Sequence, residues 1–268
     1  MKDKYAIVTG ATSGIGLELS YELAKEKYNL ILIARRKDKL RELSEILINK
    51  YDVYANYIDF DLARVNDINN LVDKLLNISK DIDLLINNAG AGIYGYLHSL
   101  RDEDIMYIVN LNYLSPILLT KKLLPNLIER RGCVVNIVSV AAYTPIPMLE
   151  IYSSTKAALS LFTRALRIEL KRYGVRVIGV YPGYVDTPFH SNTIRVSNKE
   201  ILRKPNKFLI VDPKQVAVEI IKKIKNKRFN GDIVVSRIYR IPLFFATRFP
   251  ELVDYYIEKI YFKELSEK

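Results

Sequence analysis

The sequence is poor in the residues that form covalent cross-links and metal sites. Its 268 residues include one cysteine, two histidines and no tryptophan. A lone Cys133 excludes an internal disulfide framework and fits a reducing compartment. His98 and His190 have neither a cysteine cluster nor an H-x-x-x-H spacing beside them, so the sequence predicts no metal ion.

Long apolar runs are missing as well. A membrane-spanning helix needs about 20 apolar residues. The uncharged stretch at residues 105–120 is shorter and contains Asn110, Asn112 and Pro116. The chain starts with charged residues and passes at once into a strand-like segment, which is unlike a secretory signal peptide. We therefore predict a cytoplasmic location.

The charge of the chain is strongly basic. The net charge is +11, and residues 189–268 contribute +8 of it, with 17 Lys and Arg against 9 Asp and Glu. Such a surface can attract nucleic acid, anionic lipid or a polyanionic substrate. Because no zinc finger, helix-turn-helix or RNA-recognition signature accompanies the charge, we interpret it as a solvated basic face and expect no nucleic-acid partner.

Apolar strand-like runs alternate with segments of helical periodicity along the whole chain. The strand-like runs are residues 5–8, 29–34, 53–58, 83–86, 133–139, 175–181 and 232–235. The helical segments are residues 14–27, 37–50, 64–79, 102–130, 151–173 and 212–226. This alternation predicts an α/β fold: one doubly wound, Rossmann-type parallel sheet of seven strands with helices on both faces.

No stretch rich in glycine, proline and serine divides the chain. We therefore expect one domain at residues 1–236. Within it, residues 188–211 lack clear periodicity and are predicted to form a lid over the substrate. Residues 237–268 form a C-terminal extension, which we expect to pack on the same domain.

The first predicted strand ends in a glycine-rich turn with the spacing G-x-x-x-G-x-G, which leads into a helix. Such a turn lets backbone N–H groups approach a pyrophosphate, and the helix N-terminus attracts the negative charge. The pattern therefore predicts a dinucleotide site. The residues of the turn are Thr9, Gly10, Ala11, Thr12, Ser13, Gly14, Ile15 and Gly16.

Arg35 and Arg36 follow the second predicted strand. Dinucleotide folds that use NAD place an acidic residue near this point to hold the ribose 2′-OH. A guanidinium group instead binds the 2′-phosphate of NADP with charge-assisted, often bidentate hydrogen bonds. The two arginines therefore predict NADP(H). The alternative is that both simply begin a solvent-exposed helix.

Tyr152 and Lys156 are four residues apart in a predicted helix, so their side chains project from one face. A free phenol titrates near ~10. A neighbouring ammonium favours the phenolate, so we expect Lys156 to lower the pKa of Tyr152. Tyr152 can then exchange a proton with a carbonyl or alcohol oxygen. Ser139, at the end of the fifth predicted strand, can hydrogen-bond the same oxygen.

Four motifs occur in one order along the chain: the glycine turn, Asn87-Asn88-Ala89-Gly90, Tyr152-x-x-x-Lys156 with Ser139 thirteen residues earlier, and Pro182-Gly183-Tyr184-Val185-Asp186-Thr187. Over residues 4–235 the sequence therefore resembles the short-chain dehydrogenases/reductases. The resemblance implies an NADP(H)-dependent carbonyl reductase or alcohol dehydrogenase. Such an enzyme would transfer hydride between nicotinamide and a ketone or secondary alcohol, and the apolar residues of the predicted lid favour an apolar one.

The resemblance also implies roles for individual residues. Asn112 would join Ser139, Tyr152 and Lys156 as the catalytic set. Asn110 is the competing position, but Thr120 and Pro125 lie at the family's distances from Asn112. Lys156 would also bind the nicotinamide ribose. Further cofactor contacts would come from Asp61 and Leu62 beside the adenine, from Asn88, Ala89 and Gly90, and from Pro182, Gly183, Val185 and Thr187.

The main alternative is a catalytically silent NADP-binding sensor or interaction protein of the same fold. The complete catalytic set argues against it, because a binding module does not need Tyr152 and Lys156 together. The substrate stays open among a 3-oxoacyl thioester, a steroid-like ketone and a short aldehyde.

The C-terminal extension has apolar residues at helical spacing from about Pro250, which predicts a helix that covers the core or a subunit contact. Shallow membrane insertion, suggested by aromatic residues beside Arg237, Arg240 and Arg248, is the less favoured alternative. Family members pair through helices matching residues 102–130 and 151–173, so the resemblance implies a homodimer. The apolar surface for pairing is expected from Leu118, Leu119, Leu123, Leu127, Leu159, Phe162 and Leu166.

Overall fold

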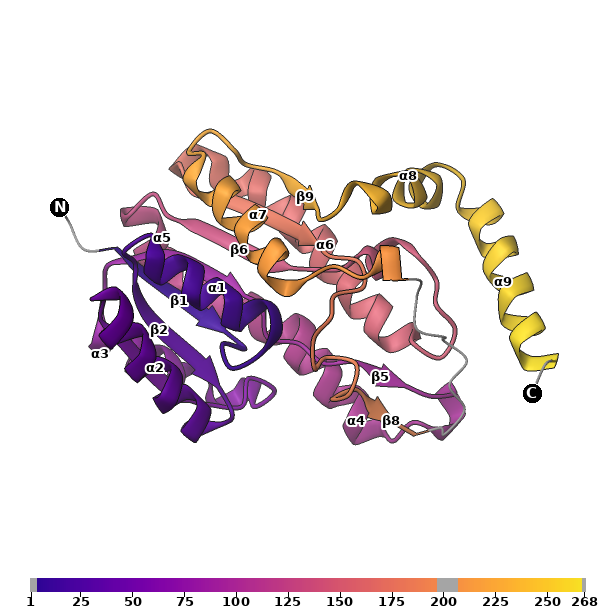
Figure 1. Cartoon of the computed structure of the whole chain (residues 1–268), viewed down its shortest axis with the longest axis horizontal. Coiled ribbons are helices and arrows are strands. Elements are labelled where there is room, and N and C mark those ends of the chain that lie inside the picture. The colour runs from indigo at the N-terminus through magenta and orange to yellow at the C-terminus, as the bar shows by residue number, and fades with distance from the viewer. Residues whose placement is uncertain (1–3, 197–206, 267–268) are drawn as a thin grey trace.

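The computed structural model describes residues 4–196 and 207–266 of the chain. Within these residues, the central sheet has seven strands in the order β3-β2-β1-β4-β6-β7-β9, and every neighbouring pair is parallel (Figure 1). The predicted fold class is therefore confirmed. The strands are β1 (Tyr5–Thr9), β2 (Asn29–Ala34), β3 (Ala55–Asp59), β4 (Ile82–Asn87), β6 (Cys133–Ile137), β7 (Arg176–Tyr181) and β9 (Asp232–Val234).

Helices connect the strands and cover both faces of the sheet. In the described residues they are α1 (Gly14–Lys25), α2 (Lys37–Tyr51), α3 (Ile68–Ile78), α4 (Asp102–Val109), α5 (Ser115–Glu129), α6 (Glu150–Leu170), α7 (Pro213–Lys225), α8 (Arg240–Arg248) and α9 (Pro250–Ser266).

The hydrophobic core consists of two layers, because neighbouring residues of a strand point to opposite faces of the sheet. Ala6 and Val8 of β1 lie in a cluster with buried residues of α1, α2 and α7. Ile7, between them, lies in a cluster with buried residues of α3, α5 and α6. The parallel strands place all their carboxyl ends along one edge, and the turns that carry the predicted site residues follow those ends.

The helix predicted at residues 102–130 is present, but it is not α-helical throughout. The structure has α4 and α5 with a π-helical turn, Asn110–Leu114, between them. Asn112 lies in this turn and is 1% exposed. A π turn has no periodicity of its own to reveal it in the sequence, and here the side chain of Asn112 bonds to the backbone of a distant loop.

Most of the apolar residues expected at the subunit contact lie in the core instead. Leu118 and Phe162 are partly buried. The others, Leu119, Leu123, Leu127, Leu159 and Leu166, are at most 7% exposed. The exposed large apolar residues of α6 are Leu161 and Ile168, at 67% and 78%. The sequence periodicity located an apolar face correctly, but the sheet already covers it.

The predicted lid contains a strand that the sequence did not indicate. β8 (Ile194–Arg195) pairs in parallel with β5 (Ile93–Tyr94), a short strand in the loop after β4. Val185 also forms a β-bridge with Val211. Residues 197–206, within the predicted lid, lie outside the described residues.

The C-terminal extension begins with a single helical turn, Arg237–Tyr239, and continues as α8 and α9. Leu243 and Ala246 of α8 are buried, and Tyr261 of α9 packs beside Tyr94 and Met148. Figure 1 shows α8 and α9 at one end of the molecule, beyond the sheet. In residues 4–196 and 207–266, no helix is both long enough and apolar enough to cross a bilayer.

Candidate active site

The glycine turn joins β1 to α1 in a conformation that requires its glycines. Gly10 and Gly14 have φ of +66° and +54°, where side chains are disfavoured. A Cβ at Gly16 would lie 2.3 Å from the Gly10 carbonyl oxygen. Among the described contacts, the Ser13 side chain makes no capping hydrogen bond to α1. The first N–H groups of α1 therefore remain available, which fits a bound pyrophosphate.

Thr9 holds the glycine turn against the loop after β4. Its hydroxyl oxygen accepts hydrogen bonds from the backbone N–H of Asn88 (2.8 Å) and Ala89 (3.0 Å). The Asn88 amide in turn donates to the Thr9 carbonyl oxygen at 2.8 Å. Sequence reasoning singled out Asn88 and Ala89 and included Thr9 in the glycine turn, but assigned Thr9 no role. A hydroxyl residue directly before the first glycine was the available signal.

Arg35 and Arg36 lie at the edge of the glycine turn. Arg36 donates to the Thr12 hydroxyl at 3.1 Å, and Arg35 donates to the Tyr107 hydroxyl at 2.6 Å. Both arginines are exposed. Burial, and next the negative charge of Asp61, raise the pKa of Tyr107. The arrangement brings two cations and a phenol to the place where the second strand meets the turn.

The two residues expected beside the adenine differ in their surroundings. Asp61 accepts a hydrogen bond from the backbone N–H of Ala63 at 3.0 Å and remains partly exposed. Leu62 is 4% exposed and packs in the core against residues of α3. Any contact of Leu62 with a nucleotide would therefore involve its backbone.

Ser139, Tyr152 and Lys156 come together at the carboxyl edge of the sheet. Ser139 lies two residues beyond the end of β6, and its Oγ accepts a hydrogen bond from the Ala141 N–H at 3.1 Å. Lys156 is 4% exposed. Its Nζ donates to the Ile137 carbonyl oxygen at 2.9 Å and lies 5.9 Å from the centroid of the Tyr152 ring.

The expected effect of Lys156 on Tyr152 is corrected by the structure. Burial raises the pKa of Tyr152 to about 12, while its interaction with Ser139 opposes the shift. Burial lowers the pKa of Lys156 to about 8. Desolvation therefore dominates the pKa of both groups, because both are removed from water.

Asn112 joins this cluster from the π turn. Its amide donates to the Ala91 carbonyl (2.9 Å) and to the Thr155 hydroxyl (3.2 Å), and its Oδ1 accepts from the Ala91 N–H (3.0 Å). A Cβ at Gly90 would lie 3.1 Å from Asn112 Oδ1 and 3.5 Å from Lys156 Nζ. Asn110, the competing position, instead lines a shallow hollow that also includes Asp61 and Tyr107.

The segment after β7 closes one side of the cluster. The Pro182 carbonyl oxygen accepts from the Val140 N–H at 3.0 Å. A methyl group added at Gly14 would lie 2.9 Å from the Thr187 side chain, so this segment reaches the glycine turn. Val185, between them, is buried.

Aromatic side chains, including Phe189 of the predicted lid, form a wall beside Tyr152. The ring centroid of Phe189 lies 5.5 Å from that of Tyr152. His190 packs edge-on to Phe189 and stacks on Tyr184 at 4.0 Å. Burial lowers the pKa of His190, which favours a neutral ring. The wall gives the reaction centre an apolar side.

A tyrosine of the C-terminal extension hydrogen-bonds the backbone of Tyr184, which is part of this aromatic wall. The Tyr239 hydroxyl accepts from the Tyr184 N–H at 3.0 Å and donates to the Leu209 carbonyl oxygen. A Cβ at Gly183 would lie 2.0 Å from the Tyr239 ring. Gly183 is therefore required for close packing, and Tyr239 ties the predicted lid to the segment after β7.

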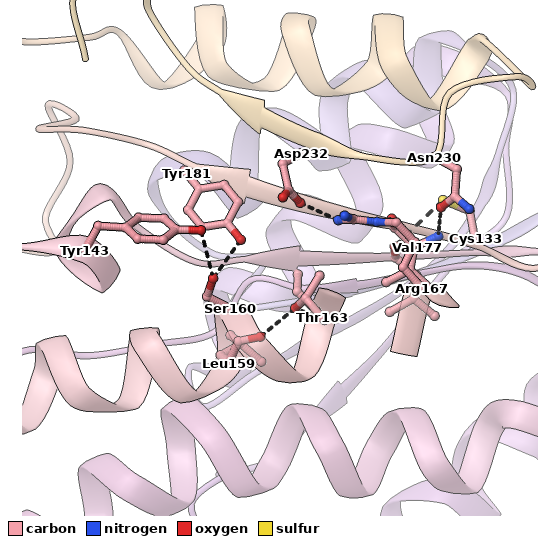
Figure 2. A network of polar contacts seen from close by, with 12 residues as sticks. Cys133, Tyr143, Leu159, Ser160, Thr163, Arg167, Val177, Tyr181, Asn230 and Asp232 are labelled. Atoms are coloured by element: carbon pink, nitrogen blue, oxygen red, sulfur yellow. Dashed lines mark hydrogen bonds and ion pairs between the residues drawn. The ribbon is translucent and has the colours of Figure 1, made fainter. Parts of the chain in front are cut away.

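A second polar network connects α6, the helix that carries Tyr152 and Lys156, to two neighbouring segments. Figure 2 shows the Ser160 hydroxyl between those of Tyr143 and Tyr181, at 3.2 Å and 2.9 Å. Ser160 lies one turn after Lys156, and the two tyrosines belong to the segments that follow Ser139 and precede Pro182. The three segments that carry the site are thus joined at one hydroxyl.

Comparison with known proteins agrees with this geometry. Residues 4–197 match the model of the short chain dehydrogenase family. The chain belongs to this family.

Particular relatives are similar over much of the chain. It is 35% identical over 190 residues to very-long-chain 3-oxoacyl-CoA reductase-B of Danio rerio, which covers 69% of this chain but only 60% of that protein. It is 35% identical over 235 residues to ketoacyl reductase HetN of a Nostoc strain, covering 87% and 79%.

Solved structures show the same fold. Alcohol dehydrogenase from the archaeon Thermococcus sibiricus, complexed with 5-hydroxy-NADP, has a TM-score of 0.79 and 26% identity, covering 89% of this chain and 98% of that one. Structures of similar proteins hold NADP(H) in some cases and NADH in others.

Proposed function

We propose that the protein is an NADP(H)-dependent oxidoreductase that reduces the ketone of an apolar 3-oxoacyl thioester, or oxidises the corresponding alcohol. The observation that carries the proposal is the convergence of Ser139, Tyr152 and Lys156 at the carboxyl edge of the sheet, the same edge that carries the glycine turn after β1. The sequence left the ketone open. The names of the Danio and Nostoc relatives favour the 3-oxoacyl class.

The side chains divide the chemistry in a simple way. NADPH, when bound along the glycine turn, supplies the hydride. The Ser139 oxygen accepts from Ala141 N–H, so the hydroxyl proton, which interacts with Tyr152 when no substrate is bound, can turn to hydrogen-bond the substrate oxygen. Tyr152 gives a proton to that oxygen as it becomes an alkoxide, and an alkoxide is basic enough to take it from a phenol of raised pKa.

Lys156 and Asn112 organise the same centre. Lys156 holds a proton beside Tyr152 and would bind the nicotinamide ribose, while Asn112 hydrogen-bonds the backbone of the loop at Ala91. A silent NADP-binding sensor of the same fold is the alternative function. It would bind NADPH but reduce no carbonyl compound.

The catalytic part of the proposal is tested by following NADPH absorbance with 3-oxoacyl-CoA substrates of increasing chain length and with a short aldehyde. Turnover should be highest for the long acyl chains. Tyr152→Phe should lower turnover by about 10²–10⁴ while NADPH binding survives, and Lys156→Ala should lose both. Tyr54→Phe, an exposed tyrosine, is the control. Near-normal turnover in Tyr152→Phe would contradict the mechanism.

Cofactor preference is tested separately. NADPH is favoured by the exposed Arg35 and Arg36 and by the NADP(H) complexes of solved relatives. We expect a much higher kcat/KM with NADPH than with NADH. Arg35→Asp with Arg36→Ala should reduce this preference by about 1.5–3 kcal/mol. Arg41→Ala, an exposed arginine of α2, should not change it. Equal use of both cofactors by the unaltered protein would contradict the assignment.

A further inference from the structure

Helix α8 is apolar on two opposite sides. Leu243 and Ala246 face the domain and are buried. On the other side, Ile241, Phe244 and Phe245 are 68%, 60% and 43% exposed. A helix that is apolar all round is normally covered all round, and contiguous exposed apolar residues mark an interaction surface. The outward side of α8 therefore needs a covering partner.

The surface continues from α8 into α9. Phe249, between the two helices, is 47% exposed. Leu252, Tyr256 and Ile260 follow at intervals of four residues, so they form one stripe of α9, and each is about half exposed. We call Ile241, Phe244, Phe245, Phe249, Leu252, Tyr256 and Ile260 the apolar strip.

The charges beside the apolar strip identify the partner. Helix α8 has Arg240 near its start and Arg248 at its end, both exposed, and it contains no Asp or Glu. The next acidic residues along the chain, Glu251, Asp254 and Glu258, fall on a different stripe of α9 from that of the apolar strip. Aromatic and aliphatic side chains flanked by arginines fit the interface of an anionic bilayer.

A second copy of the chain fits this surface less well. A symmetric dimer contact joins the same patch on both subunits. Around a two-fold axis at α8, Arg240 and Arg248 would face the same arginines of the partner, with no acid on either α8 to balance them. Long arginine side chains can instead reach lipid phosphates while their stems stay against apolar surface.

We propose that the apolar strip rests in the interface of an anionic lipid bilayer and attaches the protein to it peripherally. The attachment has a consequence for the active site, which rests on the proposed function. Helix α8 packs on the turn Val140–Tyr143, which directly follows Ser139. Tyr261 of α9 packs beside Tyr94 and Met148. The bilayer would therefore lie close to the reaction centre, where a lipid-soluble acyl chain could enter from it.

Co-sedimentation of the full chain with vesicles tests the attachment without any activity measurement. The protein should sediment with vesicles of phosphatidylcholine and phosphatidylglycerol, and less with phosphatidylcholine alone or at high salt. Phe244→Ser with Phe245→Ser should weaken binding to the anionic vesicles about tenfold or more. Arg240→Ala with Arg248→Ala should remove most of the salt dependence.

The control replaces Ile46 and Ile48, exposed residues of α2 at the far end of the molecule, by serine (Figure 1). This variant should bind vesicles as the unaltered protein does. Failure of the unaltered protein to sediment with anionic vesicles would overturn the proposal, and so would an equal loss in the control variant. A fall in mass by light scattering in Phe244→Ser with Phe245→Ser, without vesicle binding by the unaltered protein, would assign the strip to a second copy.

Discussion

A single hydroxyl group links the segments that carry the catalytic residues. Ser160 is 4% exposed and Tyr181 is 1% exposed, so the hydrogen bond between them is made away from water. Burial is also the main reason why the pKa of Tyr181 is raised, which keeps this phenol neutral. A buried polar group without a partner costs more free energy than the bond itself contributes.

We therefore expect Ser160→Ala to lower the free energy of unfolding by about 1–3 kcal/mol, because it leaves two tyrosine hydroxyls without this partner. Chemical denaturation measures the change. Ser154→Ala, an exposed position on the same helix, should stay within about 0.5 kcal/mol of the unaltered protein. In a Tyr181→Phe background the cost of Ser160→Ala should fall, and equal costs in both backgrounds would mean that the two side chains are not coupled.

At the scale of the elements, the first turn of the C-terminal extension contacts several segments that lie far from it in the sequence. Its Tyr239 joins three pieces of chain: the extension itself, the segment at Gly183 and Tyr184, and the return of the predicted lid at Leu209. Tyr184 then stacks on His190 in the aromatic wall. The extension thus helps to position residues beside Tyr152, although it follows the last strand of the sheet.

Tyr239→Phe removes the hydroxyl and leaves the ring over Gly183. Because two hydrogen bonds are lost, we expect kcat/KM for the ketone to fall five- to thirtyfold. This fall corresponds to a rise of about 1–2 kcal/mol in the activation free energy. Steady-state kinetics without vesicles measures the change. Tyr255→Phe, an exposed tyrosine of α9, should retain the original value. An unchanged kcat/KM in Tyr239→Phe would show that the hydrogen bonds of Tyr239 with Leu209 and Tyr184 do not support catalysis.

At the scale of the whole molecule, α6 has two large apolar residues on its exposed surface. Leu161 and Ile168 are seven residues apart, hence on one face of the helix. The family resemblance implies pairing through α5 and α6, and we propose a homodimer that uses this face. It is a different surface from the apolar strip, so pairing and attachment to lipid do not compete for the same residues.

Light scattering should therefore give the mass of a dimer for the full chain. Leu161→Glu with Ile168→Glu should produce a monomer, because four carboxylates would be buried without partners in the dimer. Ile46→Glu with Ile48→Glu on α2 should leave the dimer intact. A dimer that survives the changes on α6 would place the subunit contact elsewhere.

The α/β fold was predictable from the sequence alone, because it depends on local patterns. Runs such as residues 29–34 are apolar throughout, which indicates strands buried on both faces. The glycine turn was predictable for the same kind of reason: the backbone of Gly10 and Gly14 adopts angles that other residues avoid. Family membership followed from the order and spacing of motifs.

What only the tertiary structure decided depends on contacts between residues distant in the chain. The π turn at Asn112 is held by Ala91, 21 residues earlier. Gly183 is required because Tyr239, from the C-terminal extension, packs on it. The pKa of Tyr152 is raised because the surrounding elements exclude water, an effect that its spacing from Lys156 could not reveal. Burial likewise decided which apolar helix faces belong to the core and which remain available to a partner.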